Sequence, residues 1–278
     1  MKAAITDDPN SKITKVLGQI GLAFGALFML IPFIWMLSTS FKIPTEVLAW
    51  PPKLLPEHPT VQNYLGLFKE IPFARYFFNS VFISSVSTIT ILLTSIVGGF
   101  VFGKYRFPGR NLLFAVIMVT AIVPFESYII PLYELMVKWG LVNTYQGMLV
   151  PYLVISFGVF LMRQHMSSTI SDELMDAARI DGCSEWGILF RIAVPLSKSA
   201  AGALVIFAFS QAWSAFMWPL IIVNESKLFN LELGLTKFQY KFSTDYGLLM
   251  AGSILSILPM IIIFILFRRQ ITEAISTT

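Results

Sequence analysis

Carboxylates gather in one hydrophilic stretch of an otherwise apolar sequence. Of the 16 Asp and Glu residues in the chain, five fall within residues 172–185: Asp172, Glu173, Asp176, Asp181 and Glu185. Ionised carboxylates accept charge-assisted hydrogen bonds from basic and amide groups. This stretch therefore offers acceptors to the surface of another molecule.

Residues 171–190 are predicted to form two short helices joined by a tight turn. Ser171 is a suitable N-cap, and the two carboxylates that follow it lie in the first turn, where the helix dipole favours negative charge. Gly182 is expected to end the first helix with a positive φ angle, and Ser184 to cap a second helix that runs to Phe190. The segment is either an amphipathic connector on the membrane surface or a rigid knuckle that another protein contacts.

The first of these helices also carries a narrow apolar stripe. Leu174, Ala177 and Ala178 fall at positions i, i+3 and i+4, which share one face of a helix. Two alanines keep that face flat, so we expect another surface to approach it closely.

A phosphate-binding motif is nearly complete at residues 98–104, which read G-x4-G-K. Tyr105 stands where a Ser or Thr would bind magnesium, and the stretch ends an apolar helix instead of following a strand, so we interpret it as a chance match. His58 and His165 lie far apart, and Cys183 is the single cysteine. With no nucleophile–base pair and no metal-ligand spacing, the chain is predicted not to be an enzyme.

Two glutamates, Glu126 and Glu134, interrupt an apolar run next to Pro124 and Pro131. A charge in the middle of a bilayer costs about 3 kcal/mol on insertion scales, so such residues are functional candidates. Glu126 is therefore a candidate for the wall of a transport pathway or for a proton relay. The alternatives are that Glu134 reaches the outer interface and that Glu126 bonds a neighbouring helix.

A further apolar run mixes aromatic and polar side chains at Ser210, Gln211, Trp213 and Phe216. Aromatic faces stack on sugar rings, and amides and hydroxyls bond sugar hydroxyl groups, so these residues are candidates for a carbohydrate pathway. The plainer alternative is that Trp213 packs between helices and Trp218 belongs to an interfacial aromatic belt.

The overall composition excludes a water-soluble domain. The chain has 278 residues, of which 56% are hydrophobic and 13% charged, with a mean hydropathy of +0.73. Soluble domains carry about 25% charged residues. The net charge of +4 does not indicate nucleic acid as a partner, because basic residues of a membrane protein gather at membrane edges.

Six runs are long and apolar enough to cross a bilayer, which requires about 20 residues. The sixth, 111–137, is interrupted by the two glutamates, and the others contain no charge: 16–41, 76–103, 139–162, 199–224 and 246–267. Because Asp7 and Asp8 precede the first run, we interpret it as an uncleaved span. The sequence predicts an all-α integral membrane protein with a six-helix domain over 16–267, an N-terminal segment 1–15 and a tail 268–278.

The orientation follows from the basic residues of two short loops. Residues 104–110 hold three Lys and Arg, whereas 138–143 hold one, so we expect both termini inside the cell. This orientation places the hydrophilic stretch 163–198 in the cytoplasm, and the loops 42–75 and 225–245 outside.

The cytoplasmic stretch carries a spaced motif that resembles a known signature. Asp176-Ala177-Ala178, then Gly182, then Ile192-Ala193-Val194-Pro195 follow the pattern E-A-A-x3-G-x9-I-x-L-P, with Asp for Glu and Val for Leu. This is the "EAA" signature of ATP-binding-cassette importer permeases. Other segments resemble the carbohydrate-uptake branch and the shorter permease of maltose-type transporters: 39–42, Asn63-Tyr64, Asn79-Ser80, 106–110 and 213–220.

The resemblance implies a type I importer permease whose loop docks in a cleft of a cytoplasmic ATPase. The implied contacts are Asp176, Asp181 and Gly182, with Ala177 and Ala178 as the packing face and Pro195 at the end of the signature. The implied partners are a second homologous permease, two ATP-binding-cassette ATPases, an external solute-binding protein and the lipid bilayer. ATP and magnesium would be bound by the ATPases, and this chain would bind no cofactor.

The function implied is ATP-driven import of a sugar, or of a related polyol phosphate, across a bacterial-type cell membrane. The alternative is a gradient-driven secondary transporter or channel that uses Glu126. That alternative leaves the cytoplasmic loop without a purpose.

Overall fold

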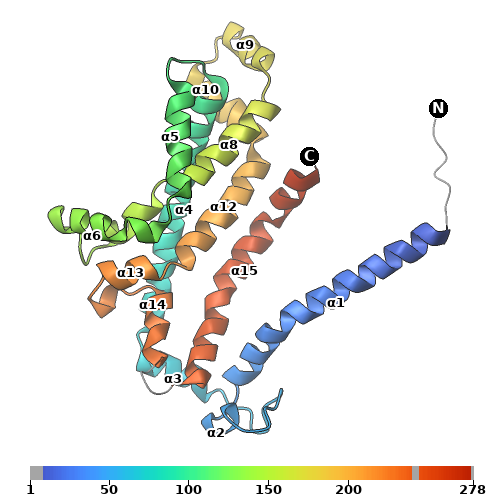
Figure 1. The fold of residues 1–278 in the computed structure, drawn as a ribbon, viewed down its shortest axis with the longest axis vertical. Coiled ribbons are helices and arrows are strands. Elements are labelled where there is room, and N and C mark those ends of the chain that lie inside the picture. Colours follow the sequence, from blue (N-terminus) through green and yellow to red (C-terminus); the bar gives the residue numbers. More distant parts are fainter. Residues whose placement is uncertain (1–8, 240–243, 277–278) are drawn as a thin grey trace. The chain divides into compact units, whose positions relative to one another are not determined.

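The computed structural model describes residues 9–239 and 244–276, and over these ranges it is helical, with one isolated bridge between Gln239 and Thr244 (Figure 1). The chain forms two compact units. The first contains Met1–Glu70 and Phe238–Leu255, and the second contains Ile71–Lys237 and Ser256–Thr278. The last helix, α15 (Tyr246–Ser276), begins in the first unit and continues in the second.

The first unit consists of a long apolar helix and a folded hydrophilic loop. The long helix is α1 (Pro9–Ser40). The shorter helices α2 (Pro44–Val47) and α3 (Gln62–Glu70) and the start of α15 complete this unit. Lys42 is buried where α1 ends; its Nζ donates to the Lys53 carbonyl at 2.6 Å and lies 4.4 Å from the Trp35 ring centre. The Asn63 amide donates to the carbonyls of Ser40 and Lys42. These bonds hold the proline-rich loop that follows α1 against the end of that helix.

The second unit is built around α4 (Phe73–Lys104), which packs against both α8 (Ser156–Thr169) and α12 (Lys198–Trp213). Small residues allow this close packing. A Cβ atom on Gly99 would lie 2.4 Å from the Met162 Cβ, and one on Gly158 would lie 2.2 Å from the Ser95 Oγ. Membrane helices associate through such small-residue contacts, because lipid supplies no hydrophobic force between them.

Shorter elements connect the main helices of this unit. They are α5 (Arg110–Ile122), η1 (Phe125–Ser127), α6 (Ile129–Lys138), α7 (Tyr145–Leu149), η2 (Val150–Tyr152), α13 (Met217–Ile222), η4 (Ser226–Leu228), α14 (Leu231–Leu235) and η5 (Thr236–Phe238), together with the elements of residues 171–196 described below.

Four helical segments of the described chain are long and apolar enough to cross a membrane: Val16–Ser40, Phe73–Lys104, Lys198–Ile222 and Tyr246–Gln270. A fifth exists if Tyr145–Tyr152 and Ser156–Thr169, bent by 44° at their junction, are one broken span. Large apolar side chains of α1, such as Leu22 and Phe24, are exposed and need lipid or a partner to cover them. The count of six spans and the orientation stay predictions.

The prediction of one continuous span over 111–137 is wrong. Helix α5 has 13 residues, about 20 Å, which is shorter than a hydrocarbon core of about 30 Å. Pro124 disfavours helical geometry at the preceding residue, and Val123 accordingly has extended backbone angles of φ −72° and ψ 118°. After the 3-10 turn η1, α6 leaves in a different direction from α5 (Figure 1).

Candidate functional site

Residues 171–190, called the knuckle from here on, form the two short helices that the sequence predicted. Helix α9 (Asp172–Ile180) is capped by Ser171, whose Oγ accepts from the Leu174 amide at 3.2 Å. Helix α10 (Glu185–Ile188) is capped in the same way by Ser184, which accepts from the Gly187 amide. Gly182 between them has a φ of +78°, so the predicted turn is confirmed.

The knuckle is fixed to the helical core by buried apolar side chains. Met175 on α9 is only 2% exposed, and with Ile188 and Leu189 it joins the cluster that contains Met162 and Met166 of α8. One turn of π-helix, η3 (Leu189–Ala193), and then α11 (Val194–Leu196) lead into α12. Pro195 lies in α11 and is exposed. The knuckle is therefore a rigid extension of the bundle.

Charged side chains tie the knuckle to the end of α4. The Lys104 Nζ lies 2.5 Å from the Asp172 carboxylate and donates to the Ile170 carbonyl at 2.7 Å. Tyr105 donates its hydroxyl hydrogen to Glu185 of α10. Hydrogen bonding and charge from Lys104 lower the pKa of Asp172, and burial, followed by Glu185, raises the pKa of Tyr105 to about 12.

Arg179 joins the two helices of the knuckle. Its Nε donates to Glu185 Oε1 at 2.9 Å, and its Nη1 donates to Asp176 Oδ1 at 2.8 Å. Asp176 is therefore already partnered, although its carboxylate stays largely exposed and has further acceptor sites. The Asp181 carboxylate has no hydrogen-bond or ion-pair partner within the described ranges.

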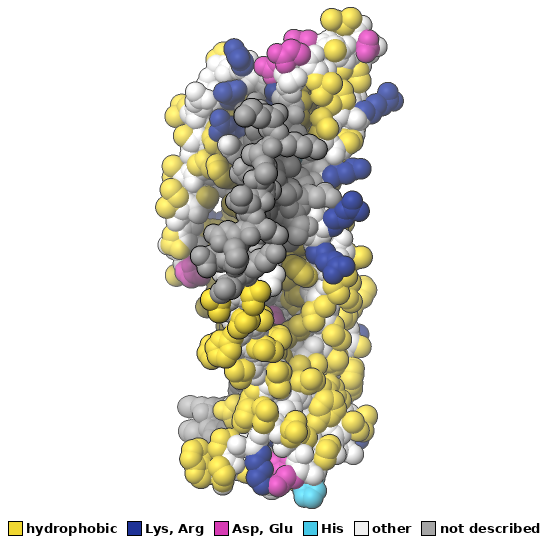
Figure 2. Space-filling view, turned by 90° about the vertical axis from the view of Figure 1, so that its right-hand side faces the viewer, with side chains coloured by type: hydrophobic (Ala, Val, Ile, Leu, Met, Phe, Trp, Pro, Cys, Tyr) yellow, Lys and Arg dark blue, Asp and Glu magenta, His cyan; other side chains and the backbone are white. Residues whose placement is uncertain are grey.

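The outward face of the knuckle is more apolar than the sequence analysis expected. Leu174 and Ala177 are exposed, as expected, whereas Ala178 is half-buried. The analysis missed Ile180, which is 86% exposed, and Trp186, which is 64% exposed and stacks on Phe190. An isolated apolar side chain next to a turn glycine is not conspicuous in a sequence. Figure 2 shows acidic side chains at the end of the molecule that carries α9.

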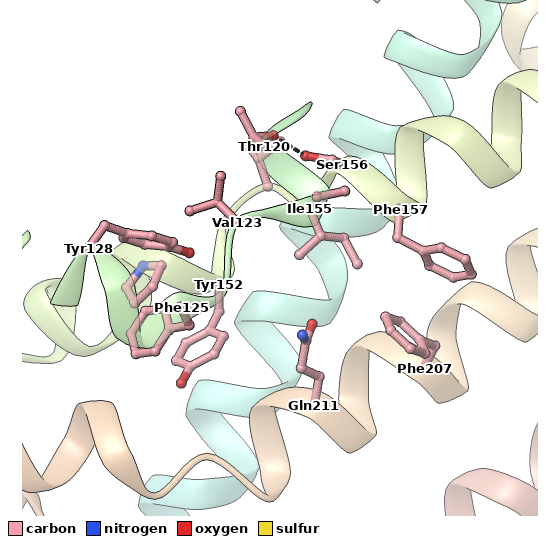
Figure 3. Close-up of a pocket in the computed structure, with 13 residues that line it drawn as sticks. Thr120, Val123, Phe125, Tyr128, Tyr152, Ile155, Ser156, Phe157, Phe207 and Gln211 are labelled. Atoms are coloured by element: carbon pink, nitrogen blue, oxygen red, sulfur yellow. Dashed lines mark hydrogen bonds between the residues drawn. The ribbon is translucent and has the colours of Figure 1, made fainter. Parts of the chain in front are cut away.

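A cavity of about 810 Å³ lies where two helical paths of the second unit are interrupted (Figure 3). Its wall comes from the end of α5, η1, η2, the start of α8 and the middle of α12. Five of the lining side chains are aromatic: Phe125, Tyr128, Tyr152, Phe157 and Phe207. Thr120 and Ser156 share a hydrogen bond of 2.6 Å at the rim, and the Gln211 side chain points into the space beside Phe207.

The predicted pathway residues separate in the structure. Gln211 lines the cavity, and Glu126 lies in η1 between the lining residues Phe125 and Tyr128, with its side chain exposed. Trp213, 3% exposed, packs between helices, where its Nε1 donates to the Ser256 carbonyl at 3.1 Å.

The remaining residues of this run also lie away from the cavity. Ser210 is half-buried on α12, and Phe216 precedes α13. Trp218 is fully buried and donates to the Gly147 carbonyl, so the interfacial-belt alternative for it is wrong. The aromatic wall was missed, although Pro124 and Pro151 next to it mark the helix breaks.

Residues 95–274 match the protein family described as "Binding-protein-dependent transport system inner membrane component". The chain belongs to this family. It is a multi-pass inner-membrane permease, and the predicted resemblance is confirmed. The arabinooligosaccharides transport system permease protein AraQ of Halalkalibacterium halodurans is 37% identical over 262 residues, which cover 93% of this permease and 94% of AraQ.

Two further comparisons agree. The lactose transport system permease protein LacG of Rhizobium radiobacter is 32% identical and covers 91% of each chain. A chain of a crystallised bacterial ABC transporter that imports the acidic polysaccharide alginate superposes with a TM-score of 0.82 at 22% identity, covering 96% of this permease and 99% of that chain. The predicted importer-permease fold is therefore confirmed.

Proposed function

We propose that this permease is one of two homologous membrane subunits of an ATP-driven importer of sugars or related polyol phosphates. The named cargo of the relatives supports this class: arabinooligosaccharides for AraQ, lactose for LacG and sn-glycerol-3-phosphate for UgpE of Brucella abortus, which is 28% identical over 275 residues. The further partners proposed are two ATPases, which bind the ATP and magnesium, and an external solute-binding protein. No nucleic acid and no cofactor of this chain are involved.

The knuckle is the proposed docking element for an ATPase. The observation that carries this proposal is a rigid acidic projection with exposed apolar side chains, Ile180 and Trp186, next to the unpartnered carboxylate of Asp181. Exposed apolar side chains on a charged surface are typical of a protein interface. Asp176 and Asp181 supply acceptors, Ala177 and Gly182 allow close approach, and the signature ends at Pro195.

Rigid attachment gives the knuckle its proposed role in transport. The knuckle is held against α4, α8 and α12 by buried Met175 and by its bonds to Lys104 and Tyr105, and its two helices are capped. Closure of the ATPases would then move these helices as a body and alternate access to the pathway. The outer loops 42–75 and 225–245 are the proposed contacts for the binding protein; the structure of the alginate importer with a periplasmic protein bound is consistent with such an arrangement.

The gradient-driven alternative is not favoured. Glu126 lies exposed in the short turn η1 instead of inside a spanning helix, and the family is one of binding-protein-dependent systems.

The test is uptake into proteoliposomes that contain the full complex, with Gly182→Asp compared with Gly140→Asp. Both glycines have positive φ angles, +78° and +67°, and open space around them, so both variants carry the same backbone strain. We expect Gly182→Asp to lower uptake per ATP, or ATPase assembly, by about tenfold, which corresponds to about 1.4 kcal/mol of interface energy. Gly140→Asp should behave as wild type. Uptake that persists without ATP would contradict the proposed function.

A further inference from the structure

The cavity lies beside the middle of a candidate membrane span, where polar side chains are uncommon. On one side of the cavity, Gln211 lies near the middle of the candidate span Lys198–Ile222. Another side is formed by residues at the break between Tyr152 and Ser156 in the bent helix pair. Irregular backbone and polar side chains are tolerated at such depth where they line a water-filled space or are buried in protein. This position indicates a polar occupant.

The chemistry of the wall narrows the kind of occupant. Aromatic rings of Phe125, Tyr152 and Phe207 supply flat apolar faces, and the Gln211 amide supplies both donors and an acceptor. Neither that amide nor the Tyr152 hydroxyl has a hydrogen-bond partner within the described ranges. Flat faces combined with unpaired hydrogen-bonding groups suit a sugar ring, which has apolar C–H faces and a rim of hydroxyl groups.

The absence of charge among the lining side chains restricts the kind of occupant further. Among the 13 lining residues, all of which lie in the described part of the chain, none is charged. The one charged side chain next to the wall in sequence is the carboxylate Glu126, between Phe125 and Tyr128. An anion in the cavity would lose its hydration and meet no compensating cation among the lining side chains, which is unfavourable.

We propose that this cavity is a carbohydrate-contact site of the permease, selective for uncharged sugars, with Gln211 as hydrogen-bonding group and Tyr152 as stacking face. The proposal rests on the proposed function and narrows it, because it excludes polyol phosphates and acidic sugars. The volume of about 810 Å³ lies within the range of about 300–1,000 Å³ typical of small-molecule sites, so a di- or trisaccharide fits.

The test uses the complete importer in proteoliposomes, with its binding protein present. The neutral probes are arabinotriose, lactose and diacetylchitobiose, and the anionic probes are sn-glycerol-3-phosphate and trigalacturonate. We expect ATP-dependent uptake of at least one neutral probe and of neither anion. Gln211→Ala should lower uptake of that probe per ATP hydrolysed by about tenfold, the effect of one lost hydrogen bond. Binding-protein-stimulated ATP hydrolysis should continue.

Matched variants separate sugar contact from helix packing. Gln164→Ala changes an exposed Gln on α8 that does not line the cavity, and it should leave uptake unchanged. Tyr152→Phe keeps the ring and should stay within about threefold of wild type, whereas Tyr152→Leu should match the loss in Gln211→Ala. Co-purification of the subunits reports whether a variant still assembles.

Three results would overturn this inference while leaving the importer intact. These are uptake of an anionic probe, wild-type uptake in Gln211→Ala and Tyr152→Leu, and loss of subunit assembly in these variants, which would assign the cavity to a helix of the second permease. Absence of any ATP-dependent uptake or stimulated hydrolysis in the wild type would instead contradict the proposed function, and this inference with it.

Discussion

The guanidinium of Arg179 and the carboxylate of Glu185 connect the two knuckle helices across the Gly182 turn, with Nε and Oε1 2.9 Å apart. The same carboxylate accepts the Tyr105 hydroxyl hydrogen from the end of α4. Glu185 is therefore the point where the knuckle and α4 are held to each other. If an ATPase docks on α9 as proposed, this carboxylate and the buried contacts of Met175 connect the docking surface to the helical bundle.

Tyr105→Phe tests this link. The substitution removes the hydroxyl but keeps the ring, which packs edge-on against Phe100 at 5.4 Å. We expect normal insertion and ATP hydrolysis, with uptake per ATP reduced roughly threefold, because one hydrogen bond of a partly exposed group is lost. Uptake and hydrolysis measured on the same proteoliposomes give the ratio. Tyr246→Phe, which changes a partly exposed tyrosine at the start of α15, is the control, and an equal effect in both variants would refute the link.

The pH dependence of the knuckle follows from the same carboxylate. Hydrogen bonds from Arg179 and then Tyr105 lower the pKa of Glu185. A group whose folded pKa is lowered stabilises the fold above its unfolded pKa of about 4.5, and this contribution is lost as the pH falls through the folded value. We therefore expect coupling of uptake to hydrolysis to stay constant from pH 7 to about pH 5 and to fall below about pH 4. Glu185→Gln should show reduced coupling that no longer changes over this acidic range, whereas an unchanged pH profile would contradict the role of Glu185.

Close packing of α4 against α8 predicts a large asymmetry between glycine substitutions. A Cβ on Gly99 would lie 2.4 Å from the Met162 Cβ and 2.8 Å from the Arg163 backbone nitrogen, whereas Gly21 on α1 has nothing within 4 Å. Gly99→Ala should destabilise the protein by about 1–3 kcal/mol through overpacking. Gly21→Ala should be neutral or stabilising by up to about 1 kcal/mol, because alanine favours a helix. Thermal unfolding in detergent compares the two, and equal midpoints would show that α4 and α8 are not in close contact.

The sequence was sufficient where structure is determined locally. Ser171, Gly182 and Ser184 define the knuckle through caps and a turn that involve neighbours within a few residues. The cavity could not be predicted in the same way, because Tyr152 and Phe207 are more than 50 residues apart in the sequence. They line one cavity only because α12 packs against α8.

The prediction of one continuous span over 111–137 was wrong for a related reason. Pro124 and Pro131 were recognised, but hydropathy alone does not distinguish a kinked span from a helix that ends at Val123 and restarts in another direction.

The exposed apolar side chain of Ile180 gives the most direct test of ATPase docking. Ile180→Ser should not destabilise the permease, because the side chain is 86% exposed and contributes little to the core. If it inserts into a cleft of the ATPase, the loss of one buried aliphatic side chain, about 1.5–3 kcal/mol, should weaken association at least tenfold. Titration of the permease in nanodiscs with purified ATPase measures this affinity.

Leu48→Ser is the matched control for Ile180→Ser, because Leu48 is a similarly exposed aliphatic side chain in the loop 42–75. This variant should bind the ATPase as wild type does. If Ile180→Ser also binds normally, the apolar face of α9 is not the docking surface. Docking would then depend on the carboxylates of Asp176 and Asp181, and the affinity should fall steeply with added salt.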